Sequence, residues 1–232
     1  MAGHLTRKEL KSDQVAVTVE HTVDYVQAHQ RPIVQIVIAA VALVVIVGGI
    51  IFYRGQQRDV RDARLAEGVR IAQAQVGGAP GTPDSYPTME AKAAEETKVF
   101  SKVLADYPGT DQGYIAEYYL AGVDVSQAKM DDARKKYKDV VDHAEKNTAS
   151  LAKYALAQIA FQENKPSDAE ALLHDLMDHP TDLVSREQAV ITLANGIKAK
   201  NPAEARKLLE PLVQEKGEIA GTASRIMNEL PK

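Results

Sequence analysis

The chain has 232 residues and a formal net charge of −4, and it contains neither cysteine nor tryptophan. The lack of cysteine excludes disulfides, thiolate zinc sites, a catalytic cysteine and a lipidated cysteine. Lysine and arginine are dispersed, so no basic stripe indicates a nucleic-acid partner. Abundant alanine and an aromatic content of only 5% favour closely packed helices over a β-rich fold. We therefore predict an all-α protein.

The chain divides into five predicted segments: a polar, amphipathic tail over 1–31, a transmembrane anchor over 32–53, a juxtamembrane helix over 54–76, a linker loop over 77–87 and a helical repeat domain over 88–232. In the tail, four valines at helical spacing would share one face: Val15, Val19, Val23 and Val26. Two interpretations of the tail stay open. It is either a small helix that docks on a partner or on the membrane surface, or a half-ordered segment.

The stretch from Ile33 to Tyr53 contains 21 residues without a charge. As a helix it would be about 31 Å long, close to the thickness of a bilayer's hydrocarbon core. It begins too far from Met1 for a cleavable signal peptide, and no small-residue cleavage site follows it. A buried core helix of a soluble protein, the alternative, rarely runs this long without a charge. We predict an uncleaved single-pass anchor in a lipid bilayer, with Pro32 interrupting the chain before it.

After the anchor, apolar residues recur at helical spacing from Leu65 to Val76, so the helix is expected to continue out of the bilayer. Aromatic and basic side chains at a helix exit favour the headgroup region. The residues predicted at the membrane interface are Arg31, Tyr53, Arg54, Arg58, Arg61 and Arg64. The linker that follows is rich in Gly and Pro, and it lacks the Gly-Lys-Ser/Thr of a phosphate-binding loop.

From Thr88 onward the sequence shows only helical patterns, separated by breakers such as Pro108-Gly109 and Asn201-Pro202. The predicted helices cover 88–106, 110–127, 130–144, 148–163, 166–178, 183–199, 201–215 and 217–229. Three alanines lie 36 residues apart: Ala133, Ala169 and Ala205. Each is followed four residues later by a large apolar residue, in order Tyr137, Leu173 and Leu209. The helices therefore come in pairs, and the pairs repeat.

Packing explains why such pairs repeat. A small residue lets the two helices of a hairpin approach closely, and the large residue fills the groove to the next hairpin, so the hairpins must stack. Over roughly 95–215 the pattern resembles the tetratricopeptide repeat, although the Trp and Tyr of the strong consensus are missing. The resemblance implies a curved solenoid in which the first helix of each pair lines the concave side. A plain array of helical hairpins is the alternative.

A candidate polypeptide-binding groove follows from this arrangement, because aromatic and amide side chains fall on the faces of the first helices. The candidate groove residues are Tyr114, Tyr118, Tyr154, Gln158, Phe161, Ile191, Asn195 and Lys198. Exposed aromatic and amide side chains suit the capture of an extended or helical peptide. The alternative is that the aromatic rings simply pack between repeats.

The sequence offers no chemistry for catalysis. It contains no H-E-x-x-H, no G-x-S-x-G and no glycine-rich dinucleotide fingerprint. His174 and His179 are five residues apart, His143 has no evident partner, and no carboxylate pairs with an unusual neighbour. We predict a non-enzymatic protein without catalytic, cofactor or metal sites and without a small-molecule substrate. An enzyme whose site is assembled from dispersed residues is a rival hypothesis.

The layout of tail, anchor, arginine-rich exit and helical repeats resembles the bacterial YfgM-like proteins, ancillary subunits of the SecYEG translocon. The local match lies in Phe52-Tyr53-Arg54 and in Asp62-Ala63-Arg64. The resemblance implies an inner-membrane protein with a cytoplasmic N-terminus and periplasmic repeats. It also implies protein partners: the translocon, a membrane-anchored chaperone or exported polypeptides. It implies no catalytic residue.

Two observations favour other interpretations. Within 20 residues of the anchor, only Arg31 lies on the N-terminal side, against five arginines on the C-terminal side. By the positive-inside rule this predicts cytoplasmic repeats and a membrane scaffold. Residues Phe100 to Thr110 resemble the repeats of outer-membrane assembly and cell-division coordinators, which are usually lipoproteins or soluble periplasmic proteins.

Overall fold

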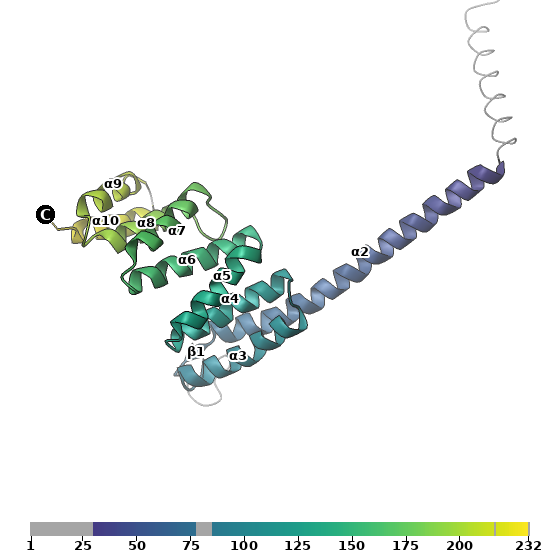
Figure 1. The fold of residues 1–232 in the computed structure, drawn as a ribbon, viewed down its shortest axis with the longest axis horizontal. Helices are drawn as coiled ribbons and strands as arrows, with labels where there is room; N and C mark the ends of the chain where they lie inside the picture. The colour runs from purple at the N-terminus through teal and green to yellow at the C-terminus, as the bar shows by residue number, and fades with distance from the viewer. Residues whose placement is uncertain (1–29, 78–84, 216, 232) are drawn as a thin grey trace, which may run out of the picture. The chain divides into compact units, whose positions relative to one another are not determined.

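The computed structural model describes residues 30–77, 85–215 and 217–231, and it confirms the all-α class. The predicted tail, apart from its last two residues, and residues 78–84 of the predicted linker lie outside the described ranges. The helices are α2 (Gln30–Gln73), α3 (Met89–Asp106), α4 (Asp111–Ser126), α5 (Met130–His143), α6 (Lys146–Gln162), α7 (Pro166–Asp178), α8 (Arg186–Ile197), α9 (Pro202–Val213) and α10 (Glu218–Glu229) (Figure 1). The chain forms two compact units, Met1–Asp59 and Val60–Lys232.

Helix α2 contains the predicted anchor, and its 44 residues form one continuous helix. Pro32 lies in its first turn, where a backbone N–H has no helical partner in any case. Within the described part of the chain, α2 is the one helix long and apolar enough to cross a membrane. Its large apolar side chains are exposed, with Val44 70% and Phe52 74% accessible. A core helix of a soluble protein would bury them instead.

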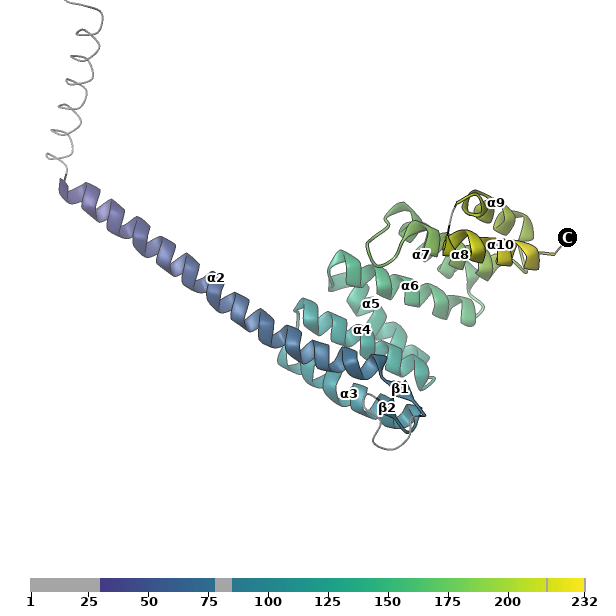
Figure 2. The ribbon, with the colours of Figure 1, turned by 180° about the vertical axis from the view of Figure 1, so that it is seen from behind.

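Two short strands that the sequence analysis did not predict follow α2. β1 (Gln75–Val76) and β2 (Ser85–Tyr86) pair in parallel, with Gln75 opposite Ser85. Figure 2 shows them side by side at the C-terminal end of α2. Two residues per strand are too few to produce an alternating pattern, so the sequence carries no signal for them.

In the second unit, the last turns of α2 pack against α3 as a helical hairpin. The backbone of Gly68 lies so close to the ring of Phe100 that an added Cβ would be 2.5 Å from Cε1. Phe100 is fully buried and stacks on Tyr119 of α4, with ring centroids 4.6 Å apart. The predicted juxtamembrane helix therefore belongs, from Val60 onward, to the same compact unit as the repeats.

The C-terminal end of α2 is held by a side chain of α3. The ammonium group of Lys92 donates to the carbonyl oxygens of Ala72 at 2.6 Å and Ala74 at 2.9 Å. Carbonyl groups in the last turn of a helix have no helical partner, and a cation there also interacts favourably with the helix dipole. This contact ends α2 and fixes it to α3.

The later helices form the repeated hairpins that the 36-residue spacing predicts (Figure 1). The alanines of the second helices are fully buried: Ala133, Ala169 and Ala205. So are their counterparts on the first helices, Ala121, Ala157 and Ala194. Side chains that cap helix N-termini explain several boundaries, because each accepts a hydrogen bond from the first turn: Thr88, Thr110, Ser185 and Asn201. Small residues thus set the crossings, and caps set the lengths.

Candidate polypeptide-binding surface

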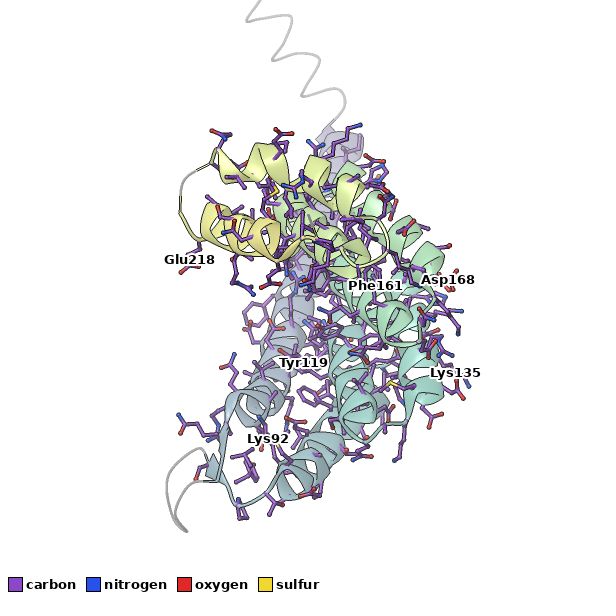
Figure 3. The ribbon with its side chains drawn as sticks, turned by 90° about the vertical axis from the view of Figure 1, so that its left-hand side faces the viewer. Lys92, Tyr119, Lys135, Phe161, Asp168 and Glu218 are labelled. Atoms are coloured by element: carbon purple, nitrogen blue, oxygen red, sulfur yellow. The ribbon has the colours of Figure 1, made fainter. Side chains whose placement is uncertain are left out.

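Two of the predicted groove residues hold α6 and α8 together. The hydroxyl of Tyr154 lies 2.7 Å from the hydroxyl of Thr192. The ring of Phe161 lies directly against the backbone of Gly196, where an added Cβ would overlap it. We call these four residues the α6–α8 seam. Figure 3 shows Phe161, and Tyr119 of α4, among the packed helices. Ring packing between repeats, one of the two interpretations above, describes these aromatic contacts.

Tyr118 and Ile191 are also partly buried in the interior. The Tyr118 ring lies 5.5 Å from that of Tyr137 and meets that of Tyr119 edge-on at 5.7 Å. Burial raises the pKa of the Tyr118 phenol. Ile191 packs against the C-terminal core. These side chains stabilise the solenoid, and they offer a partner only part of their surface.

The amides of the predicted groove are the most accessible members. Gln158 and Asn195 are exposed. Gln158 follows Tyr154 by one helical turn, and Asn195 immediately precedes Gly196, so the two amides flank the α6–α8 seam. Lys198 is less free, because its ammonium group lies 2.6 Å from the carboxylate of Glu229 on α10. At the α6–α8 seam, the two amide side chains are therefore accessible to a partner, and the aromatic rings beside them are held by packing between the helices.

Tyr114 lies apart from this seam, in a cluster of ionisable residues on the α4–α5 hairpin. Its ring stacks on that of His143, with centroids 6.1 Å apart and planes within 9°. Nδ1 of His143 lies 3.3 Å from the carboxylate of Asp139. Burial and the neighbouring Asp139 carboxylate raise the pKa of Glu117 to about 7. We call Tyr114, Glu117, Asp139 and His143 the acidic clasp.

The acidic clasp corrects two predictions. His143 does have partners, and one carboxylate does pair with an unusual neighbour, another carboxylate. The Asp139–His143 contact follows from their spacing of four residues, which places them on one helical face. Glu117 carries no such local signal, because only the register of α4 against α5 brings it to Asp139.

Two hollows lie away from the predicted groove. A cavity of about 660 Å³ lies between α5, α6 and α7, and one of about 630 Å³ between α7, α8 and α9. None of the predicted groove residues lines either cavity. Apolar side chains such as Leu172 and Leu208 form much of the lining, and Lys138 and Lys207 lie at the edges. Figure 3 shows Lys135 of α5 and Asp168 of α7 on this side of the second helices.

The residues predicted at the membrane interface are only partly described. Tyr53 is 63% exposed, and its hydroxyl accepts a hydrogen bond from Gln57 at 3.4 Å. The side chains of Arg31 and Arg54 lie outside the described part, and Arg58 is exposed. In the second unit, Arg64 is exposed, and Arg61 is half-buried with its Nε unpaired among the described atoms. In the described ranges, no three His, Asp or Glu residues gather as a metal site would require.

Comparison with known families matches residues 30–188 to the tetratricopeptide repeat-like domain. The chain belongs to this family. No curated protein and no solved structure matches it. The match begins with α2, whose last turns pack as the first helix of a hairpin. Helices α9 and α10 of this TPR-like chain lie beyond the matched residues, yet Ala205 keeps the repeat position of Ala133 and Ala169. TPR-like folds suggest protein-interaction modules.

Proposed function

We propose that this TPR-like protein binds polypeptide on the face of the α6–α8 seam, with Gln158 and Asn195 as its polar contacts. The observation that carries the proposal is that aromatic side chains packed between α6 and α8 lie beside amide side chains that are exposed to solvent. Tyr154 and Phe161 are held by Thr192 and Gly196, whereas the two amides beside them are exposed. Amides that need no rearrangement to donate and accept hydrogen bonds suit an extended backbone.

Site-specific photo-crosslinking in the full-length, membrane-bound chain tests this face. A photoreactive residue at Gln158 should crosslink to polypeptide, and one at Lys138, beside the cavity between α5 and α7, should not. The double variant Gln158→Ala with Asn195→Ala should reduce crosslinking from a third site, such as Lys198. Lys138→Ala with Lys207→Ala is the matched control on the other face. Crosslinks from Lys138 and none from Gln158 would move the binding surface to the cavities.

We further propose that the repeats face the periplasm of a bacterial inner membrane, where the protein assists exported polypeptides beside the translocon. Support comes from the resemblance of the layout to YfgM-like subunits and from the length and composition of α2. The arginine count after the anchor favours the opposite orientation, a scaffold that faces the cytoplasm. A TPR-like adaptor in outer-membrane assembly or cell division is the further alternative.

Orientation can be measured cleanly because the chain has no cysteine. Lys135→Cys places one thiol on the exposed side of α5 (Figure 3). A membrane-impermeant maleimide should label it in intact cells whose outer membrane is permeabilised. Labelling only after lysis would place the repeats in the cytoplasm and would overturn the translocon proposal, while leaving the binding face open to the crosslinking test.

A further inference from the structure

Two successive hairpins carry the same Asp–His contact at the same repeat position. In α5, Nδ1 of His143 lies 3.3 Å from the Asp139 carboxylate. At the C-terminal end of α7, 36 residues later, Nδ1 of His179 lies 3.1 Å from the Asp175 carboxylate. The first helix of each hairpin brings one more ionisable side chain to this pair, and there the two hairpins differ.

The residue that faces the aspartate has opposite charge in the two hairpins. In α6–α7 it is Lys153, whose ammonium group lies 2.5 Å from Asp175. In α4–α5 the residue 36 positions earlier is Glu117. It lies one helical turn after Tyr114, whose ring stacks on His143, and Asp139 lies one turn before His143, so the two carboxyl groups are neighbours. An ammonium group and a carboxylate attract each other throughout the pH range near neutrality. Two carboxyl groups attract only while one of them keeps its proton, as in carboxylate pairs that share a site.

The surroundings do not neutralise the carboxyl pair. The charged groups that act on Glu117 are Asp139, Lys136 and His143, all from α5. Lys136, which also lies 2.5 Å from Asp124, and His143 lower the pKa of Glu117 by less than burial and Asp139 raise it. Among the described residues, no charged group of α2, α3 or α6 adds to these. The half-buried Glu117 therefore keeps its proton to a higher pH than an ordinary glutamate.

We propose that the α4–α5 hairpin is a proton-operated clasp: one proton shared by Glu117 and Asp139 holds its open end together, and loss of that proton loosens it. The α6–α7 hairpin, with Lys153 in place of the glutamate, stays closed. In the loosened form Tyr114 would lose its stacking on His143 and become available on the first-helix face.

The opposite pKa shifts support the contrast. Burial and the Asp139 carboxylate raise the pKa of Glu117 to about 7. The hydrogen bond from Lys153 lowers the pKa of Asp175. Loosening is therefore expected between about pH 6 and pH 8 in the first hairpin and not in the second.

Hydrogen–deuterium exchange of the full-length chain in nanodiscs tests the clasp with an internal control. After correction for the intrinsic exchange rate, protection of peptides covering 114–118 and 139–143 should fall about tenfold from pH 6 to pH 8. A larger fall is not expected, because solvent screens a partly exposed pair. Peptides covering 150–154 and 175–179, measured in the same sample, should keep their protection.

Three variants make the result decisive. Glu117→Gln should keep the clasp closed and abolish the pH dependence, and Glu117→Lys, which copies the second hairpin, should do the same. His143→Gln should leave the fall in place. The proposal would be overturned if the wild-type chain lost no protection between pH 6 and pH 8, or if Glu117→Gln still lost it. It would also be overturned if His143→Gln, and not Glu117→Gln, abolished the pH dependence. The exchange measurement uses no ligand, so its outcome does not depend on whether the proposed polypeptide binding is correct. Only the suggested exposure of Tyr114 to a partner rests on the proposed function.

Discussion

The α4–α5 and α6–α7 hairpins have the same apolar core and different polar contacts. Ala121 and Ala133 cross in the first, and Ala157 and Ala169 cross in the second, all fully buried. Around these crossings both hairpins keep an Asp–His contact, but the other polar pairs differ. The open end of one hairpin holds a carboxyl pair, and that of the other holds an ion pair.

The end near the turn shows the reverse exchange. Asp124 and Lys136 form an ion pair at 2.5 Å in α4–α5. The residues 36 positions later are Ala160, which belongs to the C-terminal core, and Leu172, which packs against it. Volume at the crossing is thus kept in both hairpins, while charge beside it varies. Each hairpin needs close packing where its two helices cross. At the positions beside the crossing, either a polar pair or an apolar pair is tolerated.

If the shared core carries the stability, its truncation should have the largest effect. Leu173 of α7 is fully buried, and Leu173→Ala should lower the free energy of unfolding by about 3 kcal/mol, because it leaves a cavity. Urea unfolding of the detergent-solubilised chain, followed by circular dichroism, measures this. Leu183→Ala is the control, since Leu183 is 50% exposed and should change stability by less than about 0.5 kcal/mol. Equal losses in the two variants would contradict a core-dominated repeat.

The second prediction compares glycines on the first helices. Gly196 lies against the Phe161 ring, so Gly196→Ala should destabilise by about 2 kcal/mol through overpacking. Gly122 of α4 has room, because an added Cβ would meet only the Tyr137 hydroxyl, at an ordinary 3.7 Å. Gly122→Ala should therefore be neutral or stabilising by about 0.5 kcal/mol, as expected for alanine in a helix. Thermal unfolding should show a lower midpoint for Gly196→Ala and an unchanged or higher midpoint for Gly122→Ala. A stabilised Gly196→Ala chain would show that the α6–α8 seam is loosely packed.

How far the sequence could predict these features depends on the range of the contact. The crossing alanines were predictable because a strict 36-residue spacing repeats through the chain, and each is buried as expected. The Asp139–His143 contact was within reach of the sequence, since it lies inside one helix. Glu117 was not, because its partner is set by how two helices slide against each other.

The seam illustrates the same limit. The sequence pattern predicts Tyr154 as an exposed aromatic, but its hydroxyl lies 2.7 Å from that of Thr192, 38 residues away on the first helix of the next hairpin. Nothing in the neighbourhood of either residue signals this contact. The two amides, which have polar side chains on the same faces, are exposed as the pattern indicated. Their role in binding stays a prediction.

The third prediction transfers the carboxyl pair to the second hairpin. Lys153→Glu replaces the ion pair with two carboxylates and should destabilise by about 1 kcal/mol at pH 8, a modest figure because both side chains are partly exposed. The introduced glutamate should have a raised pKa in the folded chain, so the stability it contributes is fully present below its unfolded pKa and is lost as the pH rises. The difference from wild type should accordingly narrow at pH 5, in urea unfolding at both pH values.

The two hairpins of the wild-type chain should already show opposite pH dependences of stability. Glu117 should contribute stability in full below its unfolded pKa of 4.5, and lose it as the pH rises through its folded pKa of about 7. Asp175 should do the opposite: its contribution is present above 3.8 and is lost as the pH falls through its lowered folded pKa. A Lys153→Glu chain that is equally destabilised at pH 5 and pH 8 would show lost packing rather than repulsion.

The smallest change in stability is expected when the Asp124–Lys136 ion pair is replaced by the apolar pair found at the same repeat positions in α6–α7. Asp124→Ala with Lys136→Leu copies Ala160 and Leu172, and it should change the free energy of unfolding by less than about 0.5 kcal/mol, because removing both ions also removes their desolvation cost. Each single change should cost more, about 1 kcal/mol, since it leaves a partly buried charge without its partner. A double-mutant cycle in urea unfolding measures the coupling. Strictly additive losses would contradict this expectation, because they would mean that Asp124 and Lys136 do not interact energetically and that each stabilises α4–α5 through separate contacts.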